Sequence, residues 1–548
     1  MKGCQRASRS RRCIALVLAF CAVLFILSGC GEEDSPPAAS STPALAARQT
    51  LTFPNVGTTD LATLDPARDL DTNSRIAVTM LYSGLVRTDS NLNVIPDQAA
   101  WKISADGKVY TFHIRPDVKF ADGTPLTAQS YVSSWTRALR LPGSNHVLQF
   151  AQIIAGARDV STGKAKTLTG VKALNSHTLQ VTLTHPAPYF LTALTNPFFF
   201  PVNQKMIDHY GPKSWMEHVE GNGLGTGPFM VQRWERNVKM VFVPNPYYYG
   251  NRTRLTEVTM TFVNDAATAF KTYRARQGGD FIWGLQSADQ AVAKGLSGFI
   301  RVPLLQTNAL FFDTTTPPFD NAAVRQAFAY ATDRSELAHA IFKDTVLPTT
   351  TILPPGMPGY QPGYSGLPFD KKKAASLLQS VYPSPSAIPS ITFSYPVSEM
   401  TGDEAWMLQE MWRTTLGIQV NMRPVEDTAY KDELQRHLIQ FGLVAWQADF
   451  PDPYDCLAVN LFSHVSANNG RWSNASFDQA IEQAESLNGE ARLMLYGKAE
   501  RIAVEDAAWL PLLHETMAAV IPPWIHGVTV NGNGLYFGDW SDVYILAH

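Results

Sequence analysis

The pattern of apolar and polar residues between positions 418 and 455 predicts a strand, a helix and a second strand. Residues 418–422 alternate, residues 428–440 have a helical pattern, and the apolar run from Leu443 ends at Asp449. In such α/β units, ligands gather beyond the carboxyl ends of strands. Asp449 is therefore a candidate ligand contact. Taken alone, a carboxylate here more often caps the next turn, and both interpretations stay open.

The rest of the chain also mixes short strands with helices. Alternation predicts strands at 109–114 and 179–183, and period and capping residues predict helices at 74–82, after Thr127, at 322–331, after Asp333 and ending at Gly417. Elements mixed in this way are typical of an α/β or α+β fold.

Two further stretches are predicted to be loops. Residues 221–228 are rich in glycine, but their spacing is not that of a phosphate-binding loop and no Lys-Ser/Thr pair follows. We expect a flexible turn that leads into a strand at 229. Residues 348–368 are rich in Pro, Gly and Tyr and predict a loop that runs over the surface.

Composition sets the broad class. A chain of 548 residues exceeds what one hydrophobic core usually supports, so two or three packed units are expected. The hydrophobic content of 45% and charged content of 17% are ordinary for a folded soluble protein. A formal net charge of -3 argues against nucleic acid as a partner.

The N-terminus has the features of an export signal. Basic residues precede the apolar run 14–27, which is too short to span a bilayer and suits a signal peptide over residues 1–29. The sequence Leu-Ser-Gly-Cys at 27–30 resembles a bacterial lipobox, which would place a lipid on Cys30; the alternative is an ordinary signal peptide with a chance cysteine. Residues 30–50 predict a flexible tether. We expect an exported lipoprotein, anchored to a membrane in the periplasm or on the outer face of the cytoplasmic membrane.

The remaining chemistry is sparse. After export only Cys456 would remain beside Cys30, so no intrachain disulfide is expected. The pair at 514–515 lacks the second histidine of a zinc-protease helix. Asp449, Asp452 and Asp455 lack the glycine and glutamate of a calcium loop. We expect no catalytic residues, no cofactor and no metal.

Several stretches together resemble one family. They are residues 82–86, 111–128, 226–229 with 245–248, 318–334, and the Trp-Gln-Ala-Asp-Phe-Pro-Asp-Pro stretch at 446–453. Their order and content are similar to the extracytoplasmic solute-binding proteins of peptide ABC transporters, the oligopeptide-binding family (family 5).

The resemblance implies a bilobed class II periplasmic-binding-protein clamp with an extra sub-lobe. Lobe I would comprise residues 51–82, 200–305 and 518–548, its sub-lobe 83–199, and lobe II 306–517. A peptide would lie extended in the cleft, bonded through its main chain as an added strand. The implied partners are a small peptide and the permease subunits of an ABC transporter, and the implied state is a monomer.

The resemblance also implies site residues. Asp449 would meet the peptide's α-ammonium, and Trp446 would be an aromatic residue of the cleft. The other residues that it places in or beside the groove are Gln447, Thr72, Trp283 and Gly284. A strand-end carboxylate beside aromatic residues also suits a buried cation, because a charge-assisted hydrogen bond contributes about 1.5–3 kcal/mol.

The chain departs from the family pattern at the other end of the ligand. Leu443 and Thr401 stand where well-known members direct basic residues at the peptide carboxylate. Arg436 is a loose candidate for that role.

Three functions follow as hypotheses. The first is a receptor that captures oligopeptides and delivers them to a permease. The second, on the same fold, is a receptor for a muropeptide, a modified peptide or another small solute. The third is a secreted hydrolase that uses acid pairs among Asp449, Asp452 and Asp455, although no nucleophile–base arrangement supports it.

Overall fold

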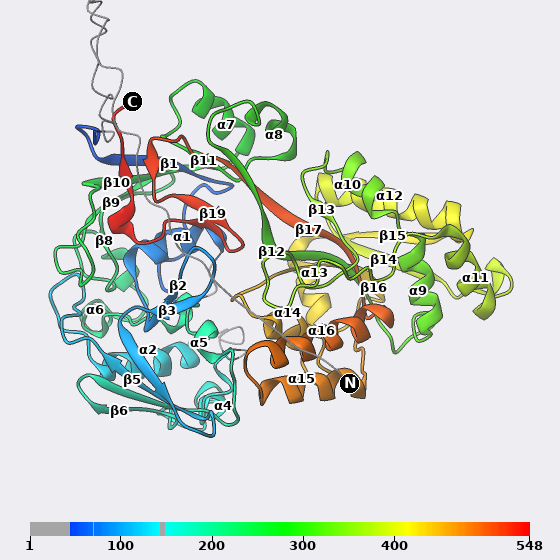
Figure 1. Ribbon diagram of the computed structural model, residues 1–548, viewed down its shortest axis with the longest axis horizontal. Coiled ribbons are helices and arrows are strands. Elements are labelled where there is room, and N and C mark those ends of the chain that lie inside the picture. Colours follow the sequence, from blue (N-terminus) through cyan, green and yellow to red (C-terminus); the bar gives the residue numbers. More distant parts are fainter. Residues whose placement is uncertain (1–43, 69–70, 143–147, 149) are drawn as a thin grey trace, which may run out of the picture. The chain divides into compact units, whose positions relative to one another are not determined.

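The computed structural model describes residues 44–548 except 69–70, 143–147 and 149 (Figure 1). The expected signal peptide, Cys30 and most of the expected tether lie outside the described residues. The expected tether boundary at residue 50 is wrong. The Ala46 N–H donates to Ile545 O at 2.8 Å, and Gln49 Nε2 donates to the same carbonyl at 2.7 Å. Thr50 already begins the first strand. Among the described residues, no helix is long and apolar enough to cross a membrane.

One sheet combines distant parts of the chain. Its order is β1 (Thr50–Val56), β10 (Glu257–Val263), β9 (Lys239–Pro244) and β8 (Phe229–Glu235), with β1 parallel to β10. It packs with α1 (Thr72–Leu81) and with residues near the C-terminus into a core that we call the terminal core. This core includes Phe53, Met260 and Trp540. The predicted helix at 74–82 is confirmed, and it begins two residues earlier because the Asp71 side chain caps it at Ser74 N.

The glycine-rich stretch before β8 is not a flexible turn, contrary to expectation. Gly225 and Gly227 are buried against the end of α1, and the Gly227 N–H donates to Leu81 O at 2.9 Å. A Cβ atom on Gly227 would lie 2.5 Å from the Leu81 carbonyl carbon. The glycines are needed because two stretches of backbone approach each other closely here. They therefore hold α1 in place.

A second sheet has the order β4 (Ala99–Ile103), β5 (Val109–Ile114), β7 (Thr178–Thr182) and β6 (Val171–Asn175). The helix α2 (Ala128–Arg140), which begins after Thr127 as predicted, packs against it. Together they form a separate core, which we call the third core and which includes Phe112, Tyr131 and Trp135. The hairpin of β2 (Val86–Thr88) and β3 (Val94–Pro96) precedes this sheet along the chain.

The largest sheet has seven strands. Its order is β11 (Ile282–Trp283), β17 (Trp509–Val520), β12 (Phe299–Phe312), β16 (Phe441–Gln447), β14 (Ile391–Pro396) and β15 (Val420–Val425), and β13 (Leu347–Pro348) pairs with β17. Its accompanying helices are α9 (Ala322–Ala331), α10 (Arg334–Ala340), α11 (Lys371–Val381), α12 (Glu399–Leu416), α13 (Asp427–Gln435), α14 (Pro453–Leu461), α15 (Ala475–Glu485) and α16 (Gly489–Glu505). Elsewhere lie the short helices α4 (Ala157–Ser161), α5 (Phe190–Ala193), α6 (Gln204–Tyr210), α7 (Ala266–Arg274) and α8 (Ser287–Ala293).

The predicted strand–helix–strand unit around position 430 is present, with shifted bounds. The helix expected at 428–440 is α13, which ends at Gln435 because His437 has a left-handed φ of 52°. The strand expected at 418–422 is β15, and the apolar run before Asp449 is β16, which ends at Gln447. The helices predicted at 322–331, after Asp333 and ending at Gly417 are confirmed as α9, α10 and α12.

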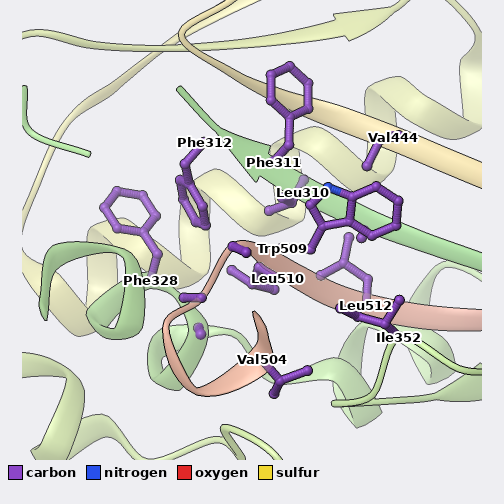
Figure 2. Packing of buried hydrophobic residues seen from close by; sticks show 14 of the residues in the cluster. Leu310, Phe311, Phe312, Phe328, Ile352, Val444, Val504, Trp509, Leu510 and Leu512 are labelled. Carbon is purple, nitrogen blue, oxygen red and sulfur yellow. The ribbon is translucent and has the colours of Figure 1, made fainter. Parts of the chain in front are cut away.

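The core around this sheet, which we call the large core, is rich in aromatic rings. Phe312, Phe328 and Phe441 contact one another, and the centroids of Phe312 and Phe441 are 4.9 Å apart. Figure 2 shows part of this packing, with Leu310 of β12 and Leu510 of β17 among the buried side chains. The strands β12 and β17 run side by side (Figure 1) and contribute to both the large core and the terminal core.

Residues 348–368 are only partly a surface loop. Thr351, Ile352 and Leu353 are buried, and the backbone N–H groups of Ile352 and Leu353 donate to Glu500 at 2.9 and 2.8 Å. The prediction from Pro and Gly content failed here because a buried carboxylate of α16 satisfies backbone that would otherwise need water.

Candidate ligand-binding site

A cavity of about 360 Å³ lies at the carboxyl end of β16. Its walls come from α1, from the β2–β3 region, from the stretch just after β16 and from the C-terminal residues 531–540. Charged side chains line it from several of these segments: Asp71, Arg75, Arg87, Asp97, Asp449 and Asp539. Aromatic side chains line it too, among them Phe200, Tyr248 and Trp540. A pocket that combines apolar walls with a few polar groups suits a small ligand.

Asp449 occupies the position that the sequence predicted for a ligand contact. It lies two residues beyond the end of β16, and its N–H is held by Asp455 Oδ2 at 3.0 Å. Its Oδ1 lies 3.7 Å from Arg75 Nη2 of α1. The two side chains are 27% and 35% exposed, so this ion pair is open to solvent on the cavity side.

Asp452, the first of the two acids that follow Asp449, has a structural role. Asp452 caps α14, since its Oδ1 accepts the Tyr454 N–H at 2.9 Å, and both its oxygens bind Arg492 at 2.8 and 2.7 Å. The residue that caps the next helix is therefore Asp452. Burial alone would lower the pKa of the Arg492 guanidinium. The charge of Asp452 and the hydrogen bonds to it together have the larger effect, so the pKa is raised.

Asp455 is fully buried beneath Asp449. Burial, with the nearby charge of Asp449, raises the pKa of this carboxyl well above its usual range. Its Oδ2 accepts the Trp446 indole N–H and the Asp449 N–H, each at 3.0 Å. Asp455 therefore fixes the backbone that presents Asp449.

The structure brings three of the predicted ligand residues to one cavity. Thr72, Gln447 and Asp449 all line it. Trp446 is half-buried against the large core, with its indole bonded to Asp455, and is not among the lining residues. Trp283 is buried in the terminal core, where its indole N–H donates to Pro54 O at 2.8 Å. Gly284 follows it with a left-handed φ of 68°, and neither lines the cavity.

The loose candidate for a carboxylate contact lies elsewhere. Arg436 pairs with Asp432 of α13 at 3.1 Å, and both side chains are mostly exposed. Leu443 is buried in the large core. Arg436, Leu443 and Thr401 are all absent from the lining of the cavity.

Sequence reasoning missed most of the charged wall. Arg87 lies 3.9 Å from Asp539, which is far from it along the chain. Burial raises the pKa of Asp97 to about 6, although its Oδ1 accepts the Tyr249 hydroxyl at 2.5 Å. No local pattern marks these residues. For Arg75 a weak signal existed, because it follows Thr72 by nearly one helical turn.

No metal-binding arrangement occurs in the part of the chain that the structure describes, where no three His, Cys, Asp or Glu side chains are grouped to hold an ion. His514 is buried between Thr307 and Thr351, and burial lowers its pKa to about 3. Cys456 is free and buried.

Comparison with known proteins identifies the family of this chain. The model of bacterial extracellular solute-binding proteins, family 5, matches residues 94–468. A probable deoxycholate-binding periplasmic protein of Escherichia coli, YgiS, is 30% identical over 94% of this chain and 97% of its own. The periplasmic oligopeptide-binding protein OppA of the same species is 29% identical over 88% and 90%.

Solved structures agree. The unliganded open form of the murein tripeptide-binding protein MppA has a TM-score of 0.78 and 29% identity, and the match covers 93% of this chain and 99% of that one. The resemblance found in the sequence is thereby confirmed. The chain belongs to the family 5 bacterial extracellular solute-binding proteins and has the α/β clamp fold of that family.

Proposed function

We propose that this protein is an extracytoplasmic receptor that captures oligopeptides and delivers them to an ABC permease. The observation that carries the proposal is the position of Asp449, whose carboxylate faces the cavity at the end of β16 together with Thr72 and Gln447. In this proposal Asp449 accepts the α-ammonium of the peptide. Its relative OppA is named as an oligopeptide-binding protein, which supports the same ligand class.

Such a site can accept many side chains. A charge-assisted hydrogen bond fixes the amino end of the peptide, and the exposed backbone of an extended peptide pairs as an added strand. Water and the unfilled part of the cavity accommodate the variable side chains. Recognition therefore depends on the ammonium and the main chain, and catalysis has no part in it.

We also propose that ligand binding closes the clamp. The expected lobe boundaries place lobe I and its sub-lobe at residues 51–305 and 518–548 and lobe II at 306–517, so β12 and β17 would be the connections. The pairing of these two strands changes register between Pro303 and Thr307, an irregularity where a hinge can bend. Small-angle scattering should show compaction when peptide is added. An identical profile at saturation would count against closure.

Export as a lipoprotein is part of the proposal. The lipobox-like sequence at 27–30 supports cleavage before Cys30. Replacing Cys30 with Ser should release the protein from membranes. Unchanged membrane attachment would show that the anchor lies elsewhere.

A second ligand class has an observation in its favour. YgiS, at 30% identity, is named as a probable deoxycholate-binding protein, and the cavity here combines Arg75 and Arg87 with the aromatic rings of Phe200 and Trp540. Such walls also suit an amphipathic anion or a modified peptide.

Mass spectrometry of ligand released from the purified protein separates the possibilities. Peptides of mixed sequence support the oligopeptide receptor. One defined compound supports the second class. Cleavage of added peptide would contradict both and indicate a hydrolase.

A further inference from the structure

Asp449 has a cationic partner in the protein itself. Arg75 projects from α1 to within 3.7 Å of the Asp449 carboxylate, and both side chains line the cavity. This separation is longer than the 2.7–2.9 Å of a tight charge-assisted hydrogen bond. The pair is also partly open to solvent. An incoming group can therefore replace either partner.

Replacement by a simple ammonium leaves a problem. If the α-ammonium of a peptide takes the place beside Asp449, Arg75 loses this partner and stands a few ångströms from another positive charge. The N-cap residue of the same helix, Asp71, already accepts hydrogen bonds from Ser74 N and Ser74 Oγ at 2.9 and 2.7 Å. The other arginine of the cavity, Arg87, has Asp539 as its counter-ion at 3.9 Å.

We infer that Arg75 is a specificity-determining residue that selects peptides whose first residue is Asp or Glu. This inference rests on the proposed binding of the α-ammonium at Asp449. In such a peptide the side-chain carboxylate is joined to the α-ammonium carbon by a short carbon chain. The ligand then presents one negative and one positive charge side by side, as Asp449 and Arg75 do. The ion pair between Arg75 and Asp449 in the free protein is replaced by two in the complex. The α-ammonium pairs with Asp449, and the side-chain carboxylate of the ligand pairs with Arg75.

The geometry of α1 supports this role. Arg75 lies one turn from Thr72 and one turn from Thr79, and all three line the cavity on the same side of the helix. Gly225 and Gly227 hold the end of that helix against their own backbone. The guanidinium is therefore presented from a fixed helix, and its planar shape suits a carboxylate.

Calorimetry with four peptides tests the inference. They are tetra-alanine and the same peptide with Asp, Glu or Lys as its first residue. The protein should bind the Asp and Glu peptides about tenfold more tightly than tetra-alanine, and the Lys peptide more weakly. The preference should shrink at high salt, since the charges are partly exposed to solvent.

Arg75→Gln should reduce the preference for an acidic first residue to less than about twofold, and Arg75→Lys should retain part of it. Arg87→Gln is the matched control. It removes the same charge from the same cavity, where Arg87 pairs with Asp539, and should change the affinities for the acidic and neutral peptides by the same factor.

Two results would overturn the inference: equal binding of acidic and neutral peptides by the unmodified protein, or a preference that survives in Arg75→Gln. Tight binding of tetra-alanine in either case would leave the proposed function intact. Failure of all four peptides to bind would instead contradict the proposed function, and the inference with it.

Discussion

Asp449 and Asp452 lie three residues apart after the same strand, and each pairs with an arginine, yet the two pairs differ in every physical respect. Asp449 and Arg75 are 3.7 Å apart and roughly one-third exposed. Asp452 and Arg492 form two hydrogen bonds, at 2.7 and 2.8 Å, and their side chains are 8% and 7% exposed. One pair faces the cavity, where we propose that a ligand replaces a partner, whereas the other is buried in the protein.

The residues between and after the two acids explain the difference. Phe450 does not line the cavity. It packs into the third core, with its ring 5.8 Å from that of Phe150. Tyr454 stacks on Tyr189 with ring centroids 3.8 Å apart. Residues 449–454 thus pass from the cavity wall to the buried interior within a few positions. In our proposal the same residue type serves recognition at Asp449 and stability at Asp452, because the surroundings of the two side chains differ.

The largest effect is expected from breaking the buried pair. Arg492→Ala would leave the Asp452 carboxylate buried without its partner, which costs about 3–5 kcal/mol of unfolding free energy. Urea unfolding measures the loss. Lys431→Ala, which removes an exposed ion pair with Asp427, is the control and should change stability by less than about 0.5 kcal/mol. A similar small change in Arg492→Ala would show that the buried pair contributes little.

Removal of the aromatic anchor should have the next largest effect. Phe450→Ala would leave a cavity in the third core and should cost about 3 kcal/mol. Trp406→Ala removes a larger ring that is 66% exposed, and it should cost less than about 1 kcal/mol because little packing is lost. If the two variants unfold at the same urea concentration, Phe450 is not an anchor.

The exposed pair should matter for ligand and not for stability. Asp449→Asn keeps the shape of the side chain, and we expect about 2 kcal/mol of lost affinity for a free-amine peptide, or roughly 30-fold. An N-acetylated peptide should suffer a comparable loss with the unmodified protein. The two losses should not add, because both remove the same interaction. Calorimetry on the four combinations checks this.

A loss of only a few-fold for Asp449→Asn would mean that the carboxylate is not the ammonium site. The urea midpoint serves as the control measurement, because this variant should unfold where the unmodified protein does. A large drop in stability would show that the exposed pair is structural after all, and the contrast between the two acids would fail.

The contrast also shows how far the sequence can lead. The strand end at Asp449 could be predicted because an apolar run that ends in an acid is a local pattern. The separate tasks of Asp452 and Asp455 could not, since the partner of Asp452 is Arg492, which lies 40 residues further on. Arg75 was missed for the same reason, because its approach to Asp449 depends on how α1 and β16 are brought together.

The same limit explains the errors in the loops. The spacing of the glycines argued against a phosphate loop at 221–228, but it could not reveal the close approach of Gly227 to Leu81. The elements of the fold were predictable where period and capping residues are local, as at Thr127 and Asp333. Contacts between distant segments leave no such pattern.

The smallest expected effect concerns the protonation of Glu485, which lies beside His185. Glu485 Oε2 lies 3.7 Å from His185 Nε2, close enough for an ion pair. Burial raises the pKa of Glu485 to about 7, with Arg492 opposing and Glu482 adding to the shift, and burial, with Lys108 nearby, lowers the pKa of His185. Both directions disfavour charge, so at pH 7 we expect Glu485 to be only partly ionised and the two groups not to form a full ion pair, despite their distance.

The pH dependence of stability follows from these directions. Between about pH 4.5 and 7 the folded protein keeps the proton of Glu485 while the unfolded chain loses it, so stability falls as the pH rises. His185 acts in the opposite sense, since its lowered pKa makes stability fall as the pH drops through its range. The total curve therefore mixes two opposed slopes, and a difference between variants is needed to separate them.

Glu485→Gln supplies that difference. The variant should match the unmodified protein near pH 4.5 and exceed its unfolding free energy by about 1–2 kcal/mol at pH 8, because the amide carries no charge to desolvate. Glu482→Gln on the exposed side of the same helix removes only a minor contribution to this shift and should give a much smaller divergence. Urea unfolding at a series of pH values measures both. If Glu485→Gln and the unmodified protein run parallel from pH 4.5 to 8, Glu485 is charged at neutral pH. In that case burial does not raise the pKa of Glu485 in the folded protein, and the partial ionisation expected here is contradicted.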